Sequence, residues 1–207
     1  SAYNENFARD TYKSMELTKQ NGIQTYLVIN SAVDDASLGF FIPKNPGSFV
    51  RIVKDIVGGH ESVIDYLEIL NEPNIWGGKG INKDKDNFEA VTPEGYARLF
   101  NASASAVKEM DPRIKIAGPT MAAMDVAWLD TVLSAGGAKY FDAVSFHAYK
   151  IGPDQPDFQR ELIAMRSSME RNGIGTREII DSEGNWLQES ITPHWEISSW
   201  QRLATER

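Results

Sequence analysis

The chain has 207 residues, of which 42% are hydrophobic and 24% are charged, and its formal net charge is −8. These values are typical of one globular domain or of one large piece of a domain. The acidic balance argues against a nucleic-acid partner, because phosphate binding needs clustered Lys and Arg. The absence of cysteine excludes a disulfide framework and a thiolate zinc site.

Nothing in the sequence indicates a membrane segment, since no apolar run approaches the roughly 18 residues that a span requires. We therefore expect no membrane partner. The chain starts at Ser1 without a methionine, so a leader could have been removed. We expect a secreted or periplasmic protein.

Helical and strand-like segments alternate along the chain. The helices expected in chain order are 6–21, one capped by Ser48 and ended by Gly58-Gly59, one that begins at Thr92-Pro93 and ends before Pro112, and those near 126–135, 157–172 and 194–205. The expected strands are 23–30, 64–70, 113–118, 142–147 and 177–181. Strict alternation predicts an α/β fold with about five parallel strands and crossover helices, in a single domain that covers 1–207.

Polar and ionisable residues gather directly after these strands. They are Asn30, Asn71-Glu72, Thr120, His147 with Tyr149, and Glu183 with Trp186. In parallel α/β folds, ligands bind at this rim of the sheet. Strands commonly end at polar residues, and ordinary strand termination would explain any one of these polar residues. Two glutamates, a histidine, a tyrosine and two tryptophans at successive ends indicate a site.

Two glutamates at strand ends suggest the paired carboxylates of glycoside hydrolysis. One acid protonates the leaving oxygen, and the second carboxylate attacks the sugar or activates water. Asn71, beside Glu72, could donate a hydrogen bond to a sugar hydroxyl, and Tyr149 could hold Glu183 ionised. The flat faces of two tryptophans suit sugar rings, and these are Trp76 and Trp186.

The segments "EILNEPN", "SFHAY" and "IIDSEGNW" resemble the fourth, sixth and seventh strand ends of clan A retaining glycoside hydrolases. The residues of these segments are most similar to the corresponding segments of family thirty-nine-like β-xylosidases and related cellulase-like enzymes. The resemblance implies a retaining O-glycoside hydrolase that acts on β-linked glycans, with Glu72 as acid/base and Glu183 as nucleophile. It further implies that Asn71 contacts the sugar 2-hydroxyl, that His147 and Tyr149 position substrate and nucleophile, and that neither cofactor nor metal takes part.

The resemblance covers only strands three to seven of an eight-stranded (β/α)8 TIM barrel, which usually needs about 250 residues. We therefore expect a partial barrel, truncated at both ends, whose open sheet edges invite pairing with another chain. The expected partners are a carbohydrate and either a second copy or a complementary barrel fragment. The alternative function is a catalytically incomplete fragment that binds carbohydrate or self-associates without turnover. An aldolase or metal hydrolase has less support, because no His/Asp cluster has metal-ligand spacing.

Several of these residues also have a structural interpretation. The two glutamates could be carboxylates favoured at helix starts, and His147 could be a satisfied core histidine. Trp76 could be a surface lid as readily as a sugar platform, and Asn30 could simply end its strand. Glu68, inside the second strand, is expected to face helices or solvent, although barrels sometimes bury such a charge.

Overall fold

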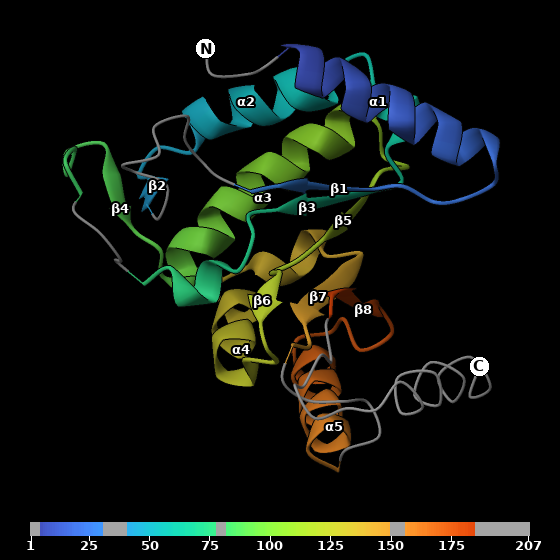
Figure 1. The fold of residues 1–207 in the computed structure, drawn as a ribbon. Coiled ribbons are helices and arrows are strands. Elements are labelled where there is room, and N and C mark those ends of the chain that lie inside the picture. Colours follow the sequence, from blue (N-terminus) through green and yellow to red (C-terminus); the bar gives the residue numbers. More distant parts are fainter. Residues whose placement is uncertain (1–4, 31–40, 78–81, 150–155, 185–207) are drawn as a thin grey trace, which may run out of the picture.

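The computed structural model describes residues 5–30, 41–77, 82–149 and 156–184 (Figure 1). Its α-helices are α1 (Glu5–Gln20), α2 (Gly47–Val57), α3 (Pro93–Met110), α4 (Val126–Ser134) and α5 (Pro156–Arg171). Its strands are β1 (Tyr26–Ile29), β2 (Phe41–Pro43), β3 (Tyr66–Ile69), β4 (Phe88–Ala90), β5 (Lys115–Ala117), β6 (Met121–Ala122), β7 (Ala143–His147) and β8 (Glu178–Glu183). Short 3-10 turns cover Glu61–Val63 (η2), Pro73–Ile75 (η3) and Gly137–Tyr140 (η4).

The main sheet is parallel and follows the chain, in the order β1, β3, β5, β7, β8. β6 continues past β5 and pairs with the end of β7. Helices separate these strands, and consecutive helices pack on one another, α2 on α3, α3 on α4 and α4 on α5. The prediction of five parallel strands alternating with helices is confirmed. Among the described residues, β1 pairs only with β3 and β8 only with β7, so the sheet is open at both edges.

The two faces of the sheet carry different side chains. Leu67 and Ile69 of β3 belong to the large apolar core beneath the helices, together with residues such as Phe100. Tyr66, one position along, belongs to a second cluster with Ala117 and Ala143 of the neighbouring strands. Because side chains alternate along a strand, Tyr66 and Glu68 share this inner face. In the described part of the chain, no helix is long and apolar enough to cross a membrane.

The helix starts agree with the sequence in part. Thr92 Oγ1 accepts a hydrogen bond from the Gly95 N–H, and proline occupies the first position of α3, as predicted. The prediction that Ser48 caps α2 is wrong, because that helix begins at Gly47 and its cap position is Pro46. The helix expected near 194–205 lies outside the described residues.

A small antiparallel pair, β2 with β4, was expected as loop. Each strand has three residues, and they lie more than forty residues apart in sequence. Strands this short carry too little alternation to be recognised, and only the folded chain brings them together.

Candidate active site

The end of β3 turns sharply and directs Glu72 toward the rim of the sheet. The β1–β3 ladder continues to Leu70, whose N–H donates to the Ile29 carbonyl at 2.9 Å. Leu70 and Glu72 then take left-handed backbone angles, with φ of 65° and 49°. For residues other than glycine such angles cost on the order of 1–3 kcal/mol each and concentrate at functional sites. This strained turn places the Glu72 carboxyl beside β7.

Asn74 fastens that turn to β6. Its Nδ2 donates to the Ala122 carbonyl at 3.1 Å, and its Oδ1 accepts from the Ala122 N–H at 2.8 Å. The amide therefore acts like one further residue of a strand ladder between η3 and β6. No role was predicted for Asn74, although it directly follows Asn-Glu-Pro in the sequence.

His147 lies between the two predicted catalytic glutamates. Its Nδ1 is 2.9 Å from Glu72 Oε1, a hydrogen bond, and 3.7 Å from Glu183 Oε2. The two carboxylate oxygens are therefore at most 6.6 Å apart, the sum of those two distances. Glu72, in the turn after β3, and Glu183, at the end of β8, thus meet at one rim of the sheet. Carboxyl groups lie about 5–5.5 Å apart in retaining glycosidases and about 6.5–9.5 Å apart in inverting ones.

Tyr149 contacts the second carboxylate directly. Its hydroxyl donates to Glu183 Oε2 at 2.6 Å, and its ring meets the His147 ring edge-on with centroids 6.0 Å apart. The hydrogen bond to the carboxylate is the main reason that the pKa of Tyr149 is raised to about 12. This hydrogen bond also fixes the orientation of the Glu183 carboxyl.

Burial decreases from the centre of the site to its edge. His147 is 1% exposed, whereas the Glu72 side chain is 23% exposed and that of Glu183 is 46% exposed. A pocket of about 590 Å³ opens beside Glu72, between η3, β6, the end of β7 and α5. Its lining comprises Glu72, Asn74, Ile75, Ala122, Ala123, Met124, Asp125, Phe146, His147, Ala148, Tyr149 and Glu161.

The remaining predicted residues have different surroundings. Asn71 is partly buried next to Glu72, and its Oδ1 has no partner among the described residues. Asn30 is exposed at the end of β1. Trp76 is 6% exposed and belongs to the apolar core, so its ring is not available as an open platform. Trp186 lies outside the described residues.

Glu68 is a polar residue whose position the sequence analysis misjudged. It was expected to face helices or solvent, but it is 0% exposed on the inner face of the sheet. Its Oε1 accepts hydrogen bonds from Ser145 Oγ and, at 3.4 Å, from Ser182 Oγ. Burial is the main cause that raises its pKa. A signal existed, since Glu68 lies between the apolar Leu67 and Ile69, and successive side chains of a strand point to opposite faces.

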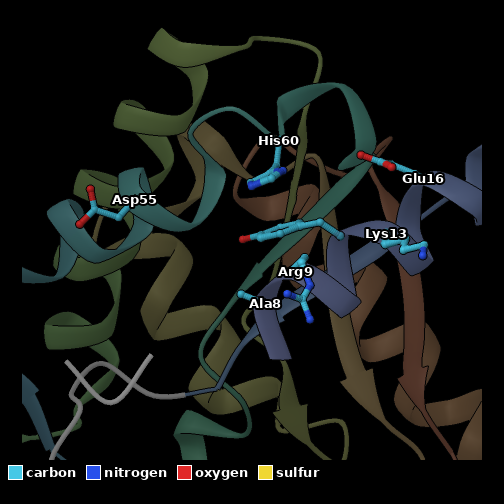
Figure 2. Close-up of a pocket in the computed structure, with 7 residues that line it drawn as sticks. Ala8, Arg9, Lys13, Glu16, Asp55 and His60 are labelled. Carbon is cyan, nitrogen blue, oxygen red and sulfur yellow. The ribbon is translucent and has the colours of Figure 1, made fainter. Parts of the chain in front are cut away.

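A second hollow, of about 560 Å³, lies between α1 and the α2–η2 region (Figure 2). The rings of Tyr12 and His60 stack there with centroids 3.5 Å apart. Arg9 and Lys13 line it together with acidic residues, so its charge is mixed. It lies away from the carboxyl ends of the strands. Among the described residues, no group of three or more His, Asp and Glu is arranged to hold a metal ion.

Comparison with known proteins gives structural matches alone. No family model matches the chain, and no curated protein matches it in sequence. A glucosidase from Croceicoccus marinus is similar with a TM-score of 0.63 at 20% identity, over 86% of this chain and 38% of the glucosidase. A monomeric β-xylosidase from Caulobacter crescentus gives a TM-score of 0.56 at 18% identity, over 86% and 40% of the two chains. AbfB, a family 51 α-L-arabinofuranosidase from Bifidobacterium longum, gives 0.56 at 13%, over 95% and 41%.

These matches define the fold. The chain has the fold of part of the TIM barrel found in clan A glycoside hydrolases, as the sequence motifs predicted. It spans about 40% of the length of each of the three matched chains. The expectation of a partial barrel is therefore confirmed, and at these identities the matches carry no residue roles.

Proposed function

We propose that this chain carries the catalytic pair of a retaining O-glycoside hydrolase that acts on β-linked glycans by double displacement. One observation carries the proposal: Glu72 and Glu183 approach the same imidazole nitrogen, and their nearest oxygens are at most 6.6 Å apart. Two carboxyl groups within this limit can reach the same sugar ring, as the pair of a retaining glycosidase must.

In this mechanism Glu72 is the acid/base. It donates a proton to the glycosidic oxygen while a Glu183 oxygen attacks the anomeric carbon, so that the bond to the leaving group breaks as the glycosyl–enzyme ester forms. Glu72 then takes a proton from water, which attacks the anomeric carbon and releases Glu183. His147, through Nδ1, holds the Glu72 carboxyl at 2.9 Å. Tyr149 orients the Glu183 carboxyl for the attack by donating to its Oε2 at 2.6 Å.

The pocket beside Glu72 accommodates the leaving group. Glu72 lines this pocket and Glu183 does not, and in double displacement the acid stands on the side of the departing oxygen. At about 590 Å³ it falls within the usual range for small-molecule sites. Ile75 and Met124 offer apolar contact for a sugar or aryl ring there.

A second candidate function follows from the open sheet. β1 and β8 each have a single partner among the described residues, and the matched glycosidases are more than twice as long as the aligned part. On this alternative the chain binds carbohydrate without turnover, or completes its barrel with a second copy or a complementary fragment. Size-exclusion chromatography with light scattering tests the pairing, and a monomer at every concentration would argue against it.

The stereochemical course of hydrolysis tests the leading proposal. Aryl β-xyloside and aryl β-glucoside are incubated with the chain, and the first-formed sugar anomer is observed by proton NMR. We expect the β-anomer first, no turnover from Glu183→Gln, and full turnover from the control Glu109→Gln, whose carboxyl is exposed on α3. The α-anomer first, or full activity of Glu183→Gln, would refute retention through Glu183. Saturable sugar binding without any product would favour the second candidate.

A further inference from the structure

A buried glutamate lies one layer beneath the candidate active site. Glu68 stands on β3 four residues before Glu72 and is 0% exposed. Its Oε1 accepts from Ser145, two residues before the site histidine on β7, and from Ser182, the residue directly before the nucleophile on β8. One carboxyl group thus joins the three strands that carry the catalytic machinery.

Small side chains let Glu68 reach that far. β5 lies between β3 and β7, and the residue paired with Glu68 on β5 is Ala117. Ala117 is in turn paired with Ala143 of β7. Two methyl groups leave the space that the longer carboxylate side chain crosses. Thr120 Oγ1, at 3.5 Å from Ser145 Oγ, extends the same network toward β6.

The surroundings of Glu68 favour its neutral form. The groups that act on its pKa are the hydroxyls of Ser145, Thr120 and Tyr26 and the ring of His147, and burial is the largest cause and raises the pKa. None of these groups is a Lys or Arg. A buried carboxylate without a cation is costly, and such groups take up a proton instead. A neutral Glu68 also adds no third negative charge beneath the catalytic pair.

We propose that Glu68 is a positioning residue that ties β3, β7 and β8 together beneath the site and thereby sets the spacing of Glu72 and Glu183 around His147. β8 depends most on this tie, since β7 is its only described strand partner and Glu183 is 46% exposed. The consequence for catalysis rests on the proposed function, whereas the tie itself is a property of the fold.

Three variants test the tie. Glu68→Gln keeps the shape and the hydrogen bonds but cannot ionise, and Glu68→Leu removes the hydrogen bonds. Glu178→Gln is the control: it lies on the same strand as Glu183 at the opposite end of the inner face, where it contacts Tyr66 at 2.6 Å. The readouts are the ¹⁵N ring signals of His147 against pH, assignable because the chain has 3 histidines, and kcat/KM on the aryl glycosides.

We expect Glu68→Gln and Glu178→Gln to retain the His147 signals and titration of the parent chain. We expect Glu68→Leu to shift the Nδ1 signal and to lower kcat/KM at least tenfold, with a smaller change in KM. Unchanged His147 signals in Glu68→Leu would overturn the tie. A His147 titration displaced by a pH unit or more in Glu68→Gln would overturn the neutral form.

If Glu68→Leu does not fold, Ser145→Ala and Ser182→Ala each remove one contact and must both perturb His147. The NMR result decides the tie even if no preparation hydrolyses a glycoside, in which case the proposed function fails separately.

Discussion

Replacing Tyr149 with phenylalanine removes a single hydroxyl from the site. That hydroxyl donates to Glu183 Oε2 at 2.6 Å and lies in no apolar core, because the tyrosine is 46% exposed. A hydrogen bond to a charged group contributes about 1.5–3 kcal/mol. The Glu183 side chain is also 46% exposed, so water replaces part of the lost bond and the lower end applies. A loss of about 1.4 kcal/mol of transition-state stabilisation corresponds to a tenfold change in rate.

The assay is kcat/KM on an aryl β-glycoside at neutral pH. The hydroxyl orients the Glu183 carboxyl, so its removal should lower kcat/KM by up to about tenfold. Tyr140→Phe serves as the control, since its hydroxyl bonds to Ser105 Oγ at 3.1 Å, outside the site. An unchanged kcat/KM in Tyr149→Phe would refute the role given to Tyr149.

Three further predictions concern stability and can be checked by urea unfolding. Asn74→Ala breaks both hydrogen bonds to Ala122 and should lower the free energy of unfolding by about 1–3 kcal/mol. It should also reduce kcat/KM, because the turn that carries Glu72 loses its support. Unchanged stability and activity would contradict this. Trp76→Ala should cost about 3–5 kcal/mol as a core truncation, whereas a drop in substrate affinity at normal stability would identify a sugar platform instead. Burial raises the pKa of Asp65, but hydrogen bonds from Lys19 and Thr25 outweigh it and leave this pKa below its ordinary value. The carboxylate therefore stabilises the fold at neutral pH. The deficit of Asp65→Asn, about 1 kcal/mol, should shrink as the pH falls below about 4 and vanish once the pH is below the lowered pKa of the folded state; a pH-independent deficit would exclude the charge effect.

The order of elements could be read from the sequence because each one carries a local signal. Apolar periodicity located α1 and α3. The start of α3 could also be predicted, because the capping residue Thr92 and the following Pro93 are adjacent in sequence. The start of α2 was misplaced because Pro46 and Gly47 give no side-chain cap to recognise. Three-residue strands such as β2 and β4 pair through a distant partner, which no local window contains.

Within the site, residue types could be predicted and contacts could not. The strand-end pattern selected the glutamates, and the structure brings Glu72 and Glu183 to one nitrogen of His147. The burial of Glu68 depends on the fold, because both faces of a parallel sheet are covered and a charged residue in such a strand need not reach solvent. The left-handed turn at Leu70 and Glu72 could not be predicted, because neither position is a glycine.

In the proposed mechanism, the carboxyl of Glu183 attacks a sugar whose leaving group is protonated by Glu72. A 2-deoxy-2-fluoro β-glycoside with an activated leaving group tests this directly, since it forms the glycosyl–enzyme ester and releases it slowly. Peptide mass spectrometry after incubation should find the fluorosugar on Glu183 in the parent chain and on no peptide of Glu183→Gln. A label on another carboxylate, or no label at all, would contradict the account.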